Sequence, residues 1–281
     1  MWALHSHKVG AWFYVVLRIG TMSKIEIIED FYSPLDKFKR TVRIDTPDSY
    51  DLDPQKRYPV IYMTDGQNVF AHPRSARYDT WCVNRTLDAL VRDGRLQREW
   101  IVCAIDHEID RFSEYTPWPY PDANIDDPRG RKFLNNLTEF FIPYMDAHYR
   151  TLKGPHNTAF IGSSLGGLMA LFCGRERPDV IGRIGAVSPS VMWADFKCFD
   201  HWNSHYDFWT KIYIDMGSDE FITVQGIDMD YAGLVGQFYE HLRQLGYRDD
   251  QVSFYVDPGG VHSEVCWARR FDRIACTLLN D

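Results

Sequence analysis

The sequence predicts an α/β fold in which a mostly parallel central sheet is covered by helices on both faces. Two observations predict it. Short apolar runs alternate along the chain with segments of helical periodicity, which is the pattern of strands joined by crossover helices. Most of these runs are apolar throughout, as expected of parallel strands that are buried on both faces. The 281 residues, 45% of them hydrophobic and 25% charged, are enough to enclose a substantial core.

The order of the elements gives the sheet an antiparallel start. Residues 25–32 and 41–46 read as two strands with a Pro/Asp-rich turn after them and no helix between them. Residues 106–130 read as a loop, and residues 188–210 form a long aromatic segment. Further strands are predicted at 60–63, 100–105, 158–161, 184–187, 212–216 and 252–256, and helices at 84–92, 133–149, 164–173, 232–245 and 265–279.

The first 21 residues differ from the rest of the chain. The apolar run at 9–17 is too short to span a bilayer as a helix, and Arg18 follows it without a small-residue cleavage site. We therefore expect residues 1–21 to be an N-terminal extension outside the core, with a secretion signal as the alternative. Residues 22–281 contain no linker and are expected to form one domain.

Composition excludes several classes of partner. The net charge is −8 and no basic stripe occurs, so binding to nucleic acid is not expected. No apolar stretch is long enough for a membrane helix. The six cysteines form no CxxC pair and several lie in apolar runs, which indicates buried free thiols and a reducing, cytoplasmic location. The oligomeric state stays open.

A Gly-x-Ser-x-Gly motif lies between the strand predicted at 158–161 and the following helix. It reads Gly162-Ser163-Ser164-Leu165-Gly166. A nucleophilic serine needs such a sharp strand-to-helix turn, and glycines two positions on either side avoid collisions with neighbouring backbone. Ser164 is the candidate nucleophile, because Ser163 lacks the symmetric glycines. The alternative is a glycine-rich turn with incidental serines.

A serine hydroxyl needs a general base, and His262 is the candidate. It follows the strand at 252–256, in the last strand-to-helix loop, where a Ser-acid-His chain order places the base. The alternative is a structural loop histidine. His201 and His205 have i,i+4 spacing, but no carboxylate motif completes a metal site. We expect no metal.

Two carboxylates compete for the role of the acid. Asp219 and Glu220 both follow the strand at 212–216, just after Gly217. The acid would hold the imidazole in one tautomer and stabilise the imidazolium. The residues alone leave both candidates open, and the other carboxylate is expected to brace the turn.

The oxyanion hole is predicted from two backbone N–H groups. One belongs to Leu165, the residue after the nucleophile, at the positive end of a helix. The other belongs to Gln67, because Gly66 lets the backbone after the strand at 60–63 approach the substrate. Asp65 is expected to brace this loop.

These motifs in combination resemble a known family. The segments 58–67, 162–167, 188–190 and 259–262, with Arg111 and residues 114–117, are similar to the esterase family of α/β-hydrolases that includes esterase D, feruloyl, acetylxylan and enterochelin esterases and the mycolyltransferase antigens. The resemblance covers residues 25–279. It implies an α/β-hydrolase fold for the domain at 22–281, no cofactor, and carboxylic-ester hydrolysis through an acyl-enzyme.

The resemblance also favours one acid. In esterase D and similar feruloyl esterases the acid stands three residues after the glycine that corresponds to Gly217, which is Glu220 here. The mycolyltransferase antigens use a glutamate in this role. The resemblance therefore implies a triad of Ser164, Glu220 and His262.

The substrate is less well defined. The aromatic side chains of residues 188–210 and of the loop at 106–130, with Trp193 and Trp118 as the candidates, suit a phenolic or sugar ring. We expect a small-molecule or carbohydrate-linked ester, either aromatic (feruloyl-like) or acetyl. The alternatives are a lid packed on itself, an acyltransferase or siderophore esterase on the same fold, and a non-catalytic binding protein.

Overall fold

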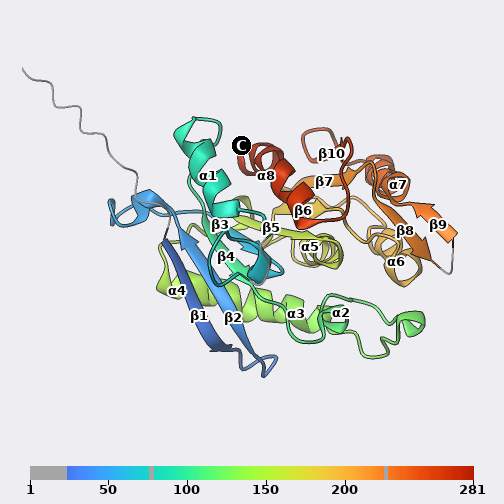
Figure 1. Ribbon diagram of the computed structural model, residues 1–281, viewed down its shortest axis with the longest axis horizontal. Helices are drawn as coiled ribbons and strands as arrows, with labels where there is room; N and C mark the ends of the chain where they lie inside the picture. The colour runs from blue at the N-terminus through green and yellow to red at the C-terminus, as the bar shows by residue number, and fades with distance from the viewer. Residues whose placement is uncertain (1–23, 76–78, 225–226) are drawn as a thin grey trace, which may run out of the picture.

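The computed structural model describes residues 24–75, 79–224 and 227–281, so the predicted extension at 1–21 lies outside the described residues. Within these ranges, eight strands form one sheet in the order β1-β2-β4-β3-β5-β6-β7-β10, and β8 and β9 form a separate hairpin (Figure 1). The strands are β1 (Lys24–Tyr32), β2 (Lys39–Thr46), β3 (Val60–Met63), β4 (Ile101–Ile105), β5 (Thr158–Ser163), β6 (Arg183–Val187), β7 (Lys211–Gly217), β8 (Phe221–Val224), β9 (Ile227–Asp230) and β10 (Val252–Asp257).

The sheet is antiparallel only at its start, as predicted. β1 pairs antiparallel with β2 and β2 with β4, whereas all the later pairs are parallel. β3, β4, β5 and β6 are buried along their whole length, which is why β3 and β4 are continuous apolar runs and β5 and β6 carry polar side chains only at their ends. The chain adds β4 on one side of β3 and β5 on the other. Ligands of such sheets bind at the carboxyl ends of the strands, next to this reversal.

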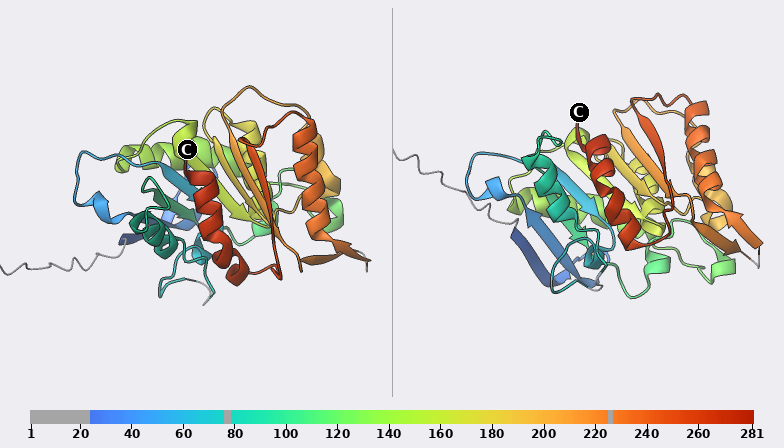
Figure 2. Two further views of the ribbon diagram at one scale, coloured as in Figure 1. Left: turned by 90° about the horizontal axis from the view of Figure 1, so that it is seen from above. Right: turned by 45° about the horizontal axis from the view of Figure 1, so that its top comes forward.

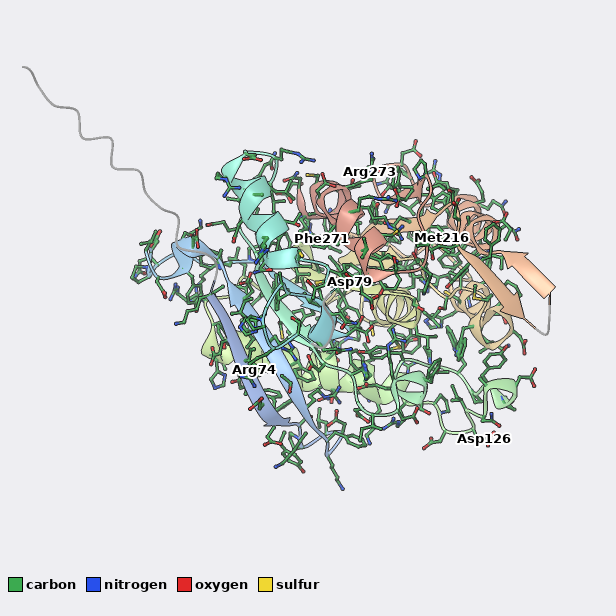
Figure 3. All side chains as sticks on the ribbon, viewed as in Figure 1. Arg74, Asp79, Asp126, Met216, Phe271 and Arg273 are labelled. Atoms are coloured by element: carbon green, nitrogen blue, oxygen red, sulfur yellow. The ribbon has the colours of Figure 1, made fainter. Side chains whose placement is uncertain are left out.

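Helices cover both faces of the sheet (Figure 2). The side chains of α1 and α8 pack on one face, and those of α3 to α7 pack on the other. Side chains fill the space between these layers, and Phe271 of α8 is completely buried there (Figure 3). The helices are α1 (Val83–Arg92), α2 (Arg111–Glu114), α3 (Gly130–Asn136), α4 (Ile142–His148), α5 (Leu165–Glu176), α6 (Trp193–His201), α7 (Tyr231–Gln244) and α8 (Glu264–Leu279).

Three segments differ from the sequence-based expectation. The helix predicted at 133–149 is divided into α3 and α4 by a wider π-type turn at Leu137–Phe141. Pro143, which has no N–H to donate, stands in the first turn of α4, and a π-type turn accommodates the missing hydrogen bond. The aromatic segment contains α6, and the segment after β7 forms the β8–β9 hairpin.

Candidate active site

Ser164 lies on the sharp turn between β5 and α5. Its φ of 58° and ψ of −123° place it outside the regions that ordinary residues favour. A Cβ atom on Gly162 would lie 2.4 Å from Thr64 Oγ1, and one on Gly166 would lie 2.2 Å from the same atom. Only glycines therefore allow β5 and α5 to approach the end of β3 so closely. Backbone strain of this kind stores roughly 1–3 kcal/mol and is concentrated at functional sites.

The Ser164 turn opens into a cavity of about 480 Å³. His262 and Gln67 line the same cavity, together with Arg111 and Asn68. The Ser164 hydroxyl lies 3.5 Å from the hydroxyl of Ser190. Between the described residues Ser164 and His262 there is no hydrogen bond, although both face the cavity. Catalytic hydrogen bonds are often long until a substrate is bound. The missing hydrogen bond between Ser164 and His262 is therefore compatible with a nucleophile and its base.

Glu220, and not Asp219, contacts His262. Glu220 Oε2 lies 2.6 Å from His262 Nδ1, and the Glu220 side chain is completely buried. Asp219 is exposed, accepts a hydrogen bond of 2.7 Å from Ser218 Oγ and donates its N–H to Gly260 O. Ser263 accepts a hydrogen bond from Cys266 N–H, which starts α8 directly after His262 and limits the freedom of the histidine loop.

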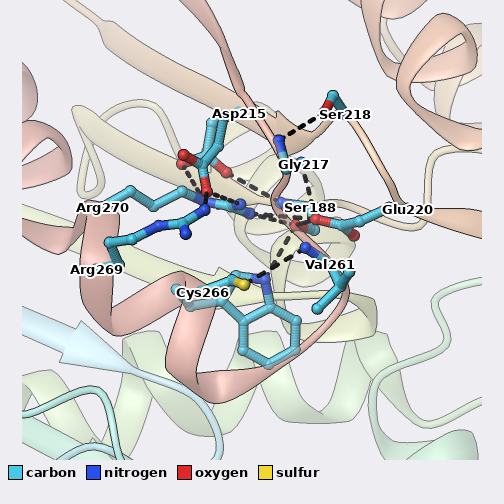
Figure 4. A network of polar contacts seen from close by, with 12 residues as sticks. Ser188, Asp215, Gly217, Ser218, Glu220, Val261, Cys266, Arg269 and Arg270 are labelled. Atoms are coloured by element: carbon cyan, nitrogen blue, oxygen red, sulfur yellow. Dashed lines mark hydrogen bonds and ion pairs between the residues drawn. The ribbon is translucent and has the colours of Figure 1, made fainter.

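The surroundings of Glu220 favour its charged form. Burial opposes the charge, but the hydrogen bonds and charge of His262, the Ser188 hydroxyl and the Gly217 N–H outweigh burial and hold the pKa of Glu220 below its ordinary value. Figure 4 shows Ser188 and Gly217 beside Glu220, where Arg270 contacts both Ser188 and Glu220. The sequence assigned no role in the site to Ser188 or Arg270. The local signals for Ser188 were its place in the segment 188–190, which resembles the esterase family, and its position directly after β6, at the carboxyl edge of the sheet.

The two candidate oxyanion donors lie near the nucleophile. Leu165 begins α5, where the first N–H groups have no acceptor within the helix. Gln67 lies in the short 3-10 turn Gly66–Asn68 and lines the cavity. Asp65 precedes this turn with a φ of 54°, and two hydrogen bonds of 2.7 and 2.8 Å join its carboxylate to Arg111. These contacts are those of a residue that braces the loop.

The two tryptophans expected to bind substrate lie outside the cavity lining. Trp193 donates a hydrogen bond of 2.9 Å to Thr116 Oγ1 and packs against Tyr120, with ring centroids 5.0 Å apart. Trp118 packs on Phe172 and His201. The structure therefore gathers Ser164, His262 and Gln67 around one cavity but does not bring Trp193 and Trp118 into it.

Within residues 24–75, 79–224 and 227–281, no group of three or more His, Cys, Asp or Glu side chains could hold a metal ion. Among the helices of the same residues, none is long and apolar enough to cross a membrane.

Known proteins with similar sequences and folds agree with this architecture. The Esterase family, described as "Putative esterase", matches residues 35–278. The uncharacterized protein YbbA of Bacillus subtilis is 26% identical over 231 residues, which are 80% of this chain and 86% of that protein.

Two solved structures share the fold. The ferulic acid esterase of Anaeromyces mucronatus, solved in complex with ferulic acid, superposes with a TM-score of 0.64 at 20% identity, over 92% of this chain and 90% of that one. The enterobactin esterase of Shigella flexneri gives a TM-score of 0.67 at 18% identity, over 92% of this chain and 59% of that one. Because the family model matches residues 35–278, the chain belongs to the Esterase family and is an ester-hydrolysing enzyme with the α/β-hydrolase fold.

Proposed function

We propose that this enzyme hydrolyses carboxylic esters through an acyl-enzyme on Ser164, with His262 as the general base and Glu220 as the acid. The observation that carries the proposal is the buried Glu220 carboxylate, which is hydrogen-bonded to His262 at the edge of the cavity that Ser164 enters. A triad needs this combination of an exposed nucleophile, a histidine and a carboxylate that sets the tautomer of the histidine.

The proposed chemistry has two half-reactions. Ser164 Oγ attacks the ester carbonyl carbon while His262 Nε2 takes its proton, and the imidazolium then gives this proton to the departing alcohol. A water molecule then attacks the acyl-enzyme in the same way, which releases the carboxylic acid product and restores the Ser164 hydroxyl. Glu220 holds the proton on His262 Nδ1, so that Nε2 is free to accept. The N–H groups of Leu165 and Gln67 are the proposed donors to the oxyanion.

We propose an aromatic or acetyl ester as the substrate. One solved structure with this fold is a ferulic acid esterase in complex with ferulic acid and another is an enterobactin esterase, which supports a small-molecule ester as the substrate. Phe112 follows the cavity residue Arg111 in the chain and packs against Trp193, with ring centroids 6.2 Å apart. Trp193 is therefore proposed to contact the part of the substrate that extends beyond the cavity. The same role for Trp118 stays a prediction.

The nucleophile is tested by Ser164→Ala. This change removes one hydroxyl from a partly exposed position, so we expect a folded protein with no turnover of 4-nitrophenyl esters and no labelling by a fluorophosphonate probe. The matched control is Ser163→Ala, which removes the rival hydroxyl and should leave Ser164 open to the probe. Retention of a tenth of the wild-type turnover by Ser164→Ala would disprove the assignment.

The same assays separate the competing functions. A non-catalytic binding protein would not react with the probe, whereas an acyltransferase would transfer the acyl group to an added alcohol faster than to water. A panel of nitrophenyl acyl chains, methyl ferulate, acetylated xylan and a catecholate siderophore would define the substrate. The division into an extension at 1–21 and an esterase domain at 22–281 stays a prediction, and so does the cytoplasmic location.

A further inference from the structure

The two oxygens of the Glu220 carboxylate have different surroundings. Oε2 faces His262. Oε1 faces the interior and accepts hydrogen bonds from Ser188 Oγ at 2.7 Å and from Gly217 N–H at 2.8 Å, while Arg270 Nη2 lies 3.4 Å away (Figure 4). One oxygen is thus surrounded by donors, and the other is left for the histidine.

The direction of the Ser188 hydroxyl proton is determined by its neighbours. Trp267 Nε1 donates to Ser188 Oγ at 3.0 Å, and Arg270 Nη2 donates to it at 2.5 Å. Indole and guanidinium groups are donors only, so both lone pairs of the hydroxyl are used. The single proton of Ser188 must therefore go to Glu220 Oε1. Because Ser188 is completely buried, no water competes for it.

Arg270 is itself held from both sides. Its Nε lies 3.0 Å from Asp215 Oδ2, two residues before the end of β7, and its Nη1 lies 3.4 Å from Asp257 Oδ2 at the end of β10. The loops that carry Glu220 and His262 follow these two strands. Arg270, from α8, thus joins the bases of both loops and fixes the donor that orients Ser188.

We propose that Ser188 is a positioning residue for ester hydrolysis, oriented by Arg270 and Trp267 and acting through Glu220. The proposal rests on the function proposed above. Three donors around Oε1 prevent the carboxylate from rotating, so Oε2 stays on His262 Nδ1. The imidazole then keeps the tautomer and orientation that direct Nε2 to the nucleophile. Ser188 is not itself one of the residues that line the cavity, although its hydroxyl accepts a hydrogen bond from Trp267, which is one of them.

A double-mutant cycle tests this role. Ser188→Ala should lower kcat for 4-nitrophenyl acetate about tenfold, with KM changed less than about twofold, because a hydrogen bond to a charged group is lost. In the Glu220→Gln background the same change should lower kcat less than about twofold, because the carboxylate on which Ser188 acts is already absent. The control is Ser33→Ala, which removes another buried hydroxyl, one that donates to Asn136 Oδ1. It should leave kcat nearly unchanged in both backgrounds.

The possible outcomes separate the positioning role from the proposed function. An equal loss of kcat from Ser188→Ala in both backgrounds would show a general structural effect and overturn the positioning role. Unchanged kcat in Ser188→Ala would overturn it as well. Wild-type turnover in Glu220→Gln would instead overturn the proposed function of Glu220. Should Ser188→Ala fold poorly, Ser188→Gly removes the same hydroxyl and suits the φ of 42° at this position. The double-mutant cycle with Ser188→Gly is then expected to give the same changes in kcat.

Discussion

The molecule buries two arginines, Arg40 and Arg270, that each contact three carboxylates but serve different parts of the chain. Both side chains are 2% exposed. Burial opposes their charge, and the nearby carboxylates outweigh it and raise the pKa of both arginines. Each has a second arginine on one of its carboxylates, Arg129 on Glu108 and Arg269 on Asp257. In the numbers of arginines and carboxylates that they contain, the two clusters are nearly equivalent.

The partners of the carboxylates distinguish the clusters. Arg40 contacts Asp36 and Glu114 at 2.5 and 2.6 Å, and Glu108 at 3.0 Å. Apart from arginines, the described partners of these three carboxylates are Asn136 and backbone N–H groups. The Arg40 cluster therefore fastens the chain before β2 to the loop after β4 and to α3.

The Arg270 cluster leaves one carboxylate oxygen for a titratable group. Glu220 Oε2 contacts His262, which lines the cavity, while Oε1 is enclosed by donors. The pKa of Glu108 is raised, by burial and by Glu114, although Arg40 and Arg129 oppose this. The pKa of Glu220 is lowered despite its burial. A buried ion cluster alone therefore does not indicate catalysis. The distinguishing feature is the Glu220 oxygen that contacts a histidine instead of an arginine.

The largest expected difference is between Glu220→Gln and Glu114→Gln. Both changes neutralise a buried carboxylate on a buried arginine. Glu220→Gln should lower kcat at least about 100-fold, since loss of the acid leaves the imidazole in the wrong tautomer. Glu114→Gln should leave kcat within about threefold. Initial rates on 4-nitrophenyl acetate, with circular dichroism to verify folding, measure both.

Asp219→Asn completes this comparison. Asp219 is exposed and lies on the same turn as Glu220 but has no contact with His262, so kcat should change less than about threefold. A larger loss of kcat in Asp219→Asn than in Glu220→Gln would move the acid role to Asp219.

A smaller effect is expected from replacing each arginine by lysine. Lysine keeps the charge but lacks the planar fork that reaches three carboxylates at once. Arg270→Lys should lower kcat about tenfold, because Ser188 loses the donor that orients it. Arg40→Lys should change kcat less than about twofold. Both variants should lose about 1–3 kcal/mol of unfolding free energy in urea. Equal losses of kcat would remove the distinction between the clusters.

The sequence predicts the sheet well because a strand that is buried on both faces is apolar at nearly every position, and a short apolar run already shows this. β3 occupies the predicted residues 60–63, and β6 and β7 extend the predicted strands by one or two residues. The β8–β9 hairpin was missed because residues 221–230 mix polar and apolar types and form no long apolar run. The division between α3 and α4 could have been suspected from Pro143.

The site could be predicted only in part for a different physical reason. Ser164 and His262 follow strands of a parallel sheet, so local signals place both at its carboxyl edge, where they line one cavity. Asp219 and Glu220 are neighbours, and only the path of the turn after Gly217 decides which carboxylate reaches the histidine. The bond between Arg270 and Ser188 joins residues 82 positions apart, and no local pattern reports such a contact.

The smallest expected effect is the pH dependence of stability, whose contributions from Glu220 and Glu108 should have opposite signs. The pKa of Glu220 is lowered by folding. Its contribution to the unfolding free energy is therefore fully present above the ordinary glutamate value of about 4.3 and is lost as the pH falls through the folded-state value. Folding raises the pKa of Glu108, so as the pH falls the folded state takes up a proton at this residue before the unfolded state does. Ionised Glu108 then lowers stability as the pH rises through the raised value.

Urea unfolding of the wild type, Glu220→Gln and Glu108→Gln between about pH 3.5 and 7 measures each contribution together with its coupling to the groups in contact, because more distant titrating groups cancel in each difference. Relative to Glu220→Gln, the wild type should lose stability as the pH falls below about 4.3. Relative to Glu108→Gln, the wild type should gain stability as the pH falls from 7 towards about 4.3. Two differences with the same sign would mean that the two carboxylates experience the same balance of burial and hydrogen bonding. A Glu220 difference with the sign expected for Glu108 would mean that the donors around Oε1 do not outweigh burial and do not favour the Glu220 anion.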